Sequence, residues 1–208
     1  MQPPFSRPVA ALLGAVLLTA TAGCTDDSAP SAKPSPSASS TTTAPTPAPP
    51  SAPLKVVVTR VSGKLPAASR KTLEANVGKT ISAYVDAAFL AGDYPRSDFD
   101  GSFGAFTSGA RRDAKGDVAL LTNRQLGPST ESVRATRRTA YLSVLAPYKV
   151  AAGVTAKVDL VFVVDRGDQP GQRVHLVGRL MLTRNKSDGG WSIFGYDLAR
   201  SQTPRSES

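Results

Sequence analysis

Val154-Thr-Ala-Lys-Val-Asp-Leu-Val-Phe-Val-Val164 is the stretch that decides the fold, because its apolar side chains recur at every second position. Such alternation with polar residues predicts a strand that has one buried face. The same pattern returns over residues 174–182, beyond the turn-forming run Asp165-Arg-Gly-Asp-Gln-Pro-Gly171. Two strands joined by a short turn pair antiparallel, so this region predicts a hairpin.

Further strands are predicted on both sides of this hairpin. Residues 133–145 form a β-rich run that stops before Pro147, and residues 191–198 form the last such run. Short, turn-rich connections favour a mainly antiparallel sheet of about four strands. A separate β-branched run over residues 54–61 predicts an additional strand near the start of the domain.

Two helical patterns lie between these regions. The first begins at Pro66 and ends near Gly92, and its apolar residues recur at three- and four-residue spacing. The second covers residues 103–121, where three glycines predict shorter pieces. The sequence therefore predicts one α+β domain over residues 54–200, with two N-terminal helices packed on a curved sheet. The apolar positions of the first helix are Leu73, Val77, Ile81, Tyr84 and Ala88.

The closing segment Gly190-Trp-Ser-Ile-Phe-Gly-Tyr-Asp197 carries the only tryptophan. Helices followed by a curved sheet with a Trp-bearing last strand resemble the nuclear transport factor 2-like superfamily, with a cystatin-like fold as the nearest alternative. The resemblance covers residues 66–200 and implies that the helices lie in the concave face of the sheet. The strand predicted over residues 54–61 departs from that pattern.

The N-terminus resembles a bacterial lipoprotein precursor. Arg7 precedes an apolar run over residues 9–20, which is shorter than the ~20 residues of a membrane-spanning helix and fits a signal peptide. Thr21-Ala-Gly23 then leads to Cys24, the only cysteine. Ala22 and Gly23 match the lipoprotein pattern, whereas Thr21 stands where that family usually has Leu.

Two processing routes fit this segment. Cleavage before Cys24 leaves a signal peptide over residues 1–23 and a lipid on the Cys24 thiol, whereas ordinary signal peptidase cuts after Ala22. A lone cysteine cannot form an internal disulfide in an oxidising compartment, which favours the lipid. The composition is similar to that of high-GC Gram-positive lipoproteins. We therefore expect an exported protein anchored to the outer face of the cell membrane.

A spacer is predicted between the anchor and the domain. Of the 26 residues in Ser28–Pro53, 25 are Ser, Thr, Ala or Pro. They offer no large apolar side chain to bury, so residues 24–53 are predicted to be a disordered tether and residues 201–208 a disordered tail.

The excess of positive charge belongs to the domain. Residues 54–208 hold 23 of the 25 basic and 14 of the 16 acidic residues, which accounts for the net charge of +9. Export argues against nucleic acid, so the expected partners are anionic headgroups, wall polymers or another envelope protein. The candidate basic surface consists of Arg111, Arg112, Arg134, Arg137 and Arg138.

Motifs for catalysis are scarce. His175 is the only histidine, so a multi-histidine metal site is excluded, and neither G-x-S-x-G nor a phosphate-binding loop occurs. No metal and no cofactor are predicted. The resembled superfamily has a cone-shaped fold, and its enzymes use acidic, histidine or tyrosine side chains in a pocket between the helices and the sheet. The resemblance therefore makes Tyr84, Asp197 and His175 the candidate pocket residues.

These observations favour a cell-surface lipoprotein whose basic domain binds an envelope component or a partner protein without catalysis. One alternative is a pocket enzyme of the nuclear transport factor 2-like type. Another is a structural module that dimerises through its sheet.

Overall fold

The computed structural model describes residues 50–185 and 188–205, which form an α+β domain. The predicted signal peptide, the lipidation of Cys24 and the tether up to residue 49 lie outside the described residues, as does the tail from residue 206. Within the described ranges, no helix combines the length and the hydropathy that crossing a membrane requires.

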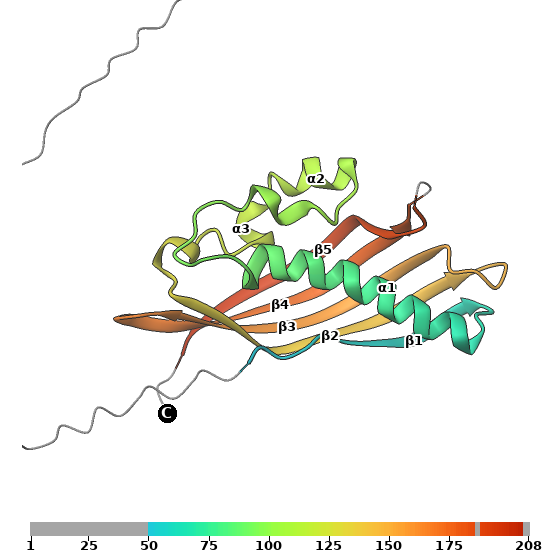
Figure 1. Ribbon diagram of the computed structural model, residues 1–208, viewed down its shortest axis with the longest axis horizontal. Helices are drawn as coiled ribbons and strands as arrows, with labels where there is room; N and C mark the ends of the chain where they lie inside the picture. Colours follow the sequence, from blue (N-terminus) through green and yellow to red (C-terminus); the bar gives the residue numbers. More distant parts are fainter. Residues whose placement is uncertain (1–49, 186–187, 206–208) are drawn as a thin grey trace, which may run out of the picture. The chain divides into compact units, whose positions relative to one another are not determined.

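Five strands form one sheet in the order β1-β2-β3-β4-β5 (Figure 1). From β2 to β5 all neighbours pair antiparallel, which confirms the mainly antiparallel sheet. In contrast, β1 pairs parallel with β2, because the helical segment between them returns the chain to the same end of the sheet. The strands are β1 (Lys55–Gly63), β2 (Ser132–Ala146), β3 (Gly153–Arg166), β4 (Gln169–Arg184) and β5 (Trp191–Pro204).

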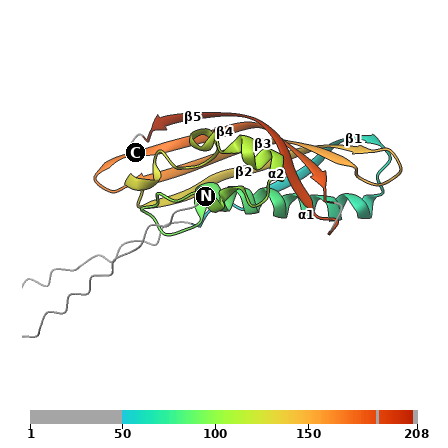
Figure 2. The ribbon, with the colours of Figure 1, turned by 90° about the horizontal axis from the view of Figure 1, so that it is seen from above.

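All described helices lie between β1 and β2 in the chain. The helices were expected to be N-terminal, but one strand of the sheet precedes them. The long helix α1 (Ala67–Val85) runs along the strands and continues as a π-helical turn to Leu90 (Figure 2). The second helical pattern is broken, as its glycines predicted. It forms α2 (Ser108–Ala114) and α3 (Val118–Leu121), together with short 3-10 turns at Asp100–Phe103 and Gly127–Ser129.

The core lies between α1 and one face of the sheet. Val77, Ile81 and Tyr84 are fully buried on α1, which agrees with the apolar stripe of the sequence. Gly78 lets α1 approach β1, because a Cβ atom there would lie 3.1 Å from Cγ2 of Val56. The sheet contributes fully buried side chains from its four antiparallel strands, namely Leu142, Leu160, Phe162, Leu176, Leu180, Leu182 and Ile193.

The boundaries of the domain are wider than expected. The sheet has five strands rather than about four, because residues 55–63 join its edge. Strand β5 runs past residue 200 to Pro204, since β4 pairs with it as far as Gln172. At the other boundary, the amide of Ala52 donates to the carbonyl of Ala135 at 2.9 Å. The end of the predicted tether therefore contacts the domain.

Candidate functional site

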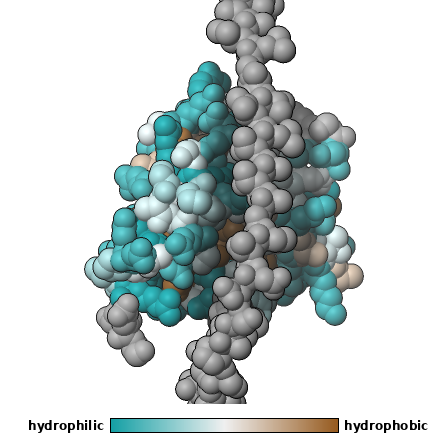
Figure 3. Space-filling view, turned by 60° about the vertical axis from the view of Figure 1, so that its left-hand side comes forward, coloured by the Kyte–Doolittle hydropathy of each residue, from teal (hydrophilic) through white to brown (hydrophobic). Residues whose placement is uncertain are grey.

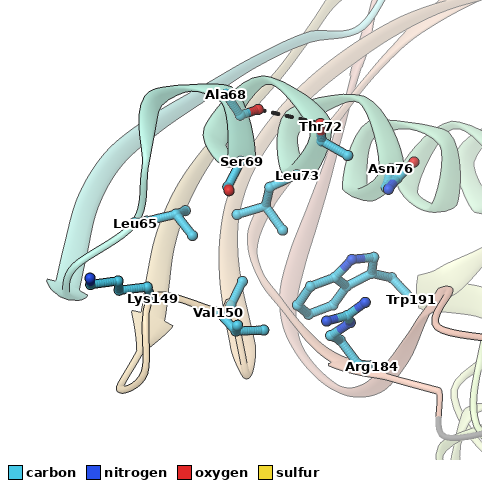
Figure 4. Close-up of a pocket in the computed structure, with 11 residues that line it drawn as sticks. Leu65, Ala68, Ser69, Thr72, Leu73, Asn76, Lys149, Val150, Arg184 and Trp191 are labelled. Carbon is cyan, nitrogen blue, oxygen red and sulfur yellow. Dashed lines mark hydrogen bonds between the residues drawn. The ribbon is translucent and has the colours of Figure 1, made fainter.

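A hollow of about 310 Å³ lies between the N-terminal half of α1 and the ends of several strands (Figure 4). The loop between β2 and β3 supplies Lys149 and Val150, the end of β4 supplies Arg184, and the start of β5 supplies Trp191. This volume is at the lower end of the range for small-molecule sites. The hollow is thus the size of a small ligand or of one end of a longer one.

One wall of the hollow is apolar. Leu65, Leu73 and Trp191 are buried side chains that point into it, and Val150 borders it from the loop (Figure 4). The hydroxyl of Thr80 donates to the carbonyl of Trp191 at 3.2 Å, which holds the start of β5 against α1. The indole is thereby fixed as part of the wall. An apolar group that binds beside it is removed from contact with water, which favours binding.

The rim of the hollow is cationic. Lys149 and Arg184 are both exposed lining residues, and Figure 4 shows the guanidinium of Arg184 beside the ring of Trp191. Among the described residues, Lys149 is the only one other than glycine with a positive φ, at 62°. That left-handed conformation disfavours side chains other than Gly, Asn and Asp. A lysine is therefore held in strained backbone at the rim.

A second hollow of about 520 Å³ adjoins the first, because Asn76 and Trp191 line both. The turn between β4 and β5 borders it. In this turn the amide of Gly190 donates to Oδ1 of Asp188 at 2.9 Å, and this bond, helped by the side chain of Asn185, lowers the pKa of Asp188. A polar hollow beside an apolar one suits a ligand with two unlike parts.

The other end of the helix layer is filled by side chains. The hydroxyl of Tyr84 donates to the carbonyl of Leu121 at 2.9 Å, and its ring meets that of Phe106 edge-on with centroids 5.0 Å apart. Phe89 stacks on Phe162, also at 5.0 Å. Burial raises the pKa of Tyr84 above its ordinary value, so the hydroxyl stays protonated. Tyr84 is a core residue there and lines neither hollow.

The structure does not bring the three candidate pocket residues together. His175 and Asp197 lie on the face of the sheet opposite Tyr84, at register positions that point away from α1. Nε2 of His175 lies 2.8 Å from Oδ1 of Asp159, and Nη2 of Arg137 lies 3.0 Å from the same oxygen. These three side chains form a polar cluster across neighbouring strands, while Asp197 is exposed.

The five arginines of the candidate basic surface are also separated. Arg111 donates to the carbonyls of Phe103 and Phe106, at 3.1 and 3.3 Å. Arg138 is buried against α1, whereas Arg137 lies on the other face, because successive residues of a strand point to opposite sides. They do not form one surface. The remaining two are Arg112, exposed on α2, and Arg134, half-buried on β2.

Hydroxyl, amide, indole and cationic groups line the first hollow. Its described lining contains no Asp, Glu, His or Cys, and its side chains of nucleophilic or basic type are Ser69, Thr72 and Lys149. In the part of the chain that the structure describes, no group of three or more such residues could hold a metal ion. No family model, curated protein or solved structure matches this chain. Its function is inferred from the lining residues.

Sequence reasoning missed the hollow. Trp191 was interpreted only as the mark of a closing strand, and Pro147 only as the point before which a strand stops. A signal was present, since Tyr148-Lys-Val150 places large apolar side chains in a turn, where polar residues are usual. The partner of His175 was missed for another reason: strand alternation predicts its face but not the register that places Asp159 beside it.

Proposed function

We propose that this chain is an exported, membrane-anchored lipoprotein whose α+β domain binds an amphiphilic envelope component without catalysing a reaction. The ligand has an apolar segment and an anionic group. The observation that carries the proposal is the joining of an apolar wall and a cationic rim in one small hollow. The apolar segment of the ligand gains free energy when Leu73 and Trp191 shield it from water, while Lys149 and Arg184 attract its anionic group.

The only tryptophan of the chain gives this proposal a direct test, because Trp191 lines the hollow. A bromine-labelled medium-chain fatty acid quenches a tryptophan that it touches. We expect saturable quenching of Trp191 fluorescence by this probe, and binding about tenfold weaker for its uncharged methyl ester. Absence of quenching, or equal binding of acid and ester, would contradict the proposal.

Charge variants at the rim provide the matched comparison. Arg184→Gln removes a cation from the hollow and is expected to weaken fatty acid binding about tenfold. Arg179→Gln removes another exposed cation from the same strand, on the outer face of the sheet. If both variants weaken binding equally, the effect reports the net charge of the protein rather than this site.

The anchoring part of the proposal rests on the N-terminal sequence. A short apolar segment, small residues and a single cysteine occur there in the order of a lipoprotein precursor. Cys24→Ser should release the protein from the membrane fraction of the producing cells, since two acyl chains are what makes such an anchor stable. Retention of the variant in membranes would refute lipidation.

The relation to the nuclear transport factor 2-like superfamily is likewise a proposal. It is supported by the position of α1 on one face of the sheet and by a last strand that begins at Trp191. The proposed relation implies that the sheet is curved and that its concave face holds the helices. Strand β1 is an addition to the pattern of that superfamily, and an experimental structure compared with its members would test the relation.

A further inference from the structure

The β2–β3 tip, residues 145–150, exposes three large apolar side chains. Leu145 is 54% exposed, Val150 is 53% exposed and Tyr148 is 87% exposed. Water contact with such groups is unfavourable, so a partner that covers them gains free energy in proportion to the apolar area removed from water. The tip therefore has the properties of an interaction surface.

Basic side chains accompany the tip. Lys149 lies within it, and Lys64 is beside it, because the amide of Lys64 donates to the carbonyl of Ala146 at 3.2 Å. Arg184 reaches the same end of the domain, since it lines the first hollow together with Lys149. Apolar side chains bordered by cations are complementary to a surface with anionic groups above an apolar layer.

The tip is also part of the mouth of the hollow. Lys149 and Val150 belong to both, and Figure 4 shows them on the loop that faces Leu65 across the opening. Whatever covers the tip therefore lies against the entrance to the hollow. The tip and the hollow are one functional end of the domain.

The size and chemistry of the tip favour one kind of partner. A specific protein interface removes about 800 Å² from each partner and involves 20–30 residues a side, far more than this tip offers. A bilayer accepts a narrow tip. Tyr and Lys suit its interfacial region, because each has an apolar stem and a polar end.

We propose that the β2–β3 tip docks into the headgroup region of a bilayer that contains anionic lipids, with Tyr148 and Val150 inserted and Lys149 at the phosphates. The first hollow then opens toward the membrane, from which an amphiphile can enter it. This inference rests on the proposed function, because it takes the ligand to be an amphiphile and the protein to be membrane-anchored.

The length of the chain permits this orientation. The chain enters the domain where Ala52 pairs with Ala135 near the start of β2, whereas the tip follows the end of β2 at Ala146. These ends are about 36 Å apart at ~3.3 Å per strand residue. The segment from Cys24 to Pro50 can span up to about 80 Å at ~3.1 Å per residue, so the tip can reach the bilayer that holds the anchor.

Vesicle flotation tests the docking. The full chain carrying Cys24→Ser, which removes the attachment point of the anchor, is mixed with phosphatidylglycerol vesicles. We expect it to float with them, and the added pair Tyr148→Ser and Val150→Ser to weaken binding about tenfold. The control is Tyr141→Ser, since Tyr141 is also exposed, at 42%, but lies in mid-strand on β2. Equal flotation of all three proteins, or no flotation of any, overturns the proposal.

A second readout places the hollow. Vesicles made of brominated phosphatidylglycerol should quench Trp191 in the Cys24→Ser chain, and the Tyr148→Ser, Val150→Ser pair should abolish that quenching. Free brominated fatty acid should still quench Trp191 in both proteins. If the free acid quenches but the vesicles neither bind nor quench, the docking is wrong and the proposed function stands. If vesicles bind but the free acid does not quench, the proposed function is wrong and so is the inference built on it.

Discussion

The two ends of the domain differ, although one sheet and one helix run through both. At the closed end, Tyr84, Phe89, Phe106 and Phe162 fill the space between helix and sheet. This end comes forward in Figure 3, where residues outside the grey atoms are mainly hydrophilic. At the open end, the hollow beside Trp191 and the apolar β2–β3 tip remain uncovered. The closed end supplies stability, and the open end has room for a ligand.

Arginine has a different task at each end. The segment 86–130 contains little regular structure, so many of its carbonyls need donors from side chains. Nη1 of Arg96 donates to the carbonyls of Ala87 and Ala91, at 2.9 and 2.8 Å, and Arg200 donates to that of Ala119 at 3.0 Å. Arg184 at the open end is exposed. Net charge is therefore a poor measure of the basic surface of this protein.

The largest expected effect comes from opening the closed end. Phe89→Ala removes the ring that stacks on Phe162 and should lower the free energy of unfolding by about 3–5 kcal/mol. Denaturant unfolding measures it. If the two ends are independent, the folded variant keeps its affinity for the fatty acid probe. A loss below about 1 kcal/mol would show that the closed end is loosely packed.

Removing a donor from the closed end should have the next largest effect. Arg200→Met leaves the carbonyls of Ala119 and Thr122 and the amide oxygen of Asn123 without this partner. Hydrogen bonds to charged groups contribute about 1.5–3 kcal/mol, so a loss of that size is expected in thermal or denaturant unfolding. Arg179→Gln is the control, since Arg179 is exposed on β4, and it should change stability by less than about 0.5 kcal/mol.

Tyr84→Phe removes only the hydroxyl that donates to Leu121 and should cost about 1–2 kcal/mol at neutral pH. It should also change the response to alkali. Because burial raises the pKa of Tyr84 in the folded state, the unfolded state loses this proton first. Stability therefore falls as the pH rises above about 10, by up to about 1.4 kcal/mol per pH unit. The variant should lack this part of the decline, and identical pH profiles would contradict the buried position.

The smallest effect on stability is expected at the open end. Lys149→Gly relieves a positive φ of 62° and should leave stability unchanged or raise it by about 1 kcal/mol. The same change removes a cation from the rim, so binding to phosphatidylglycerol vesicles should weaken. Opposite signs for stability and binding would sharpen the contrast between the two ends. If the variant is destabilised and binds the vesicles normally, the contrast between the two ends does not hold at Lys149.

The spacing of apolar residues along the sequence predicted much of the fold. The apolar stripe of α1 and the alternation in β3 and β4 appear in the structure, because both elements bury one face. Alternation did not predict that β1 would pair parallel with β2, since pairing depends on where the helical segment returns the chain. The net charge suggested a common basic surface, but Arg111 and Arg138 each bind groups of the domain itself, the carbonyl of Phe103 and the carboxylate of Asp86.

The candidate site was less predictable than the fold. A hollow forms where neighbouring helices, strands and loops do not pack against one another, and no local sequence pattern predicts such a position. Its residues come from three segments far apart in the chain, represented by Leu73, Lys149 and Trp191. The unusual apolar turn at Tyr148 was the one local signal, and its meaning depended on the three-dimensional position of the hollow behind it.

The parallel pairing of β1 has a consequence for the timing of folding. Its contacts span long stretches of chain, as in the bond from the hydroxyl of Thr59 to the carbonyl of Leu142, 83 residues apart. Long-range pairing of this kind forms slowly, because a large loop must close first. The strand that leaves the ribosome first is thus completed only after β2 has been made. The sheet therefore closes late, after the whole helical segment between β1 and β2 has been synthesised.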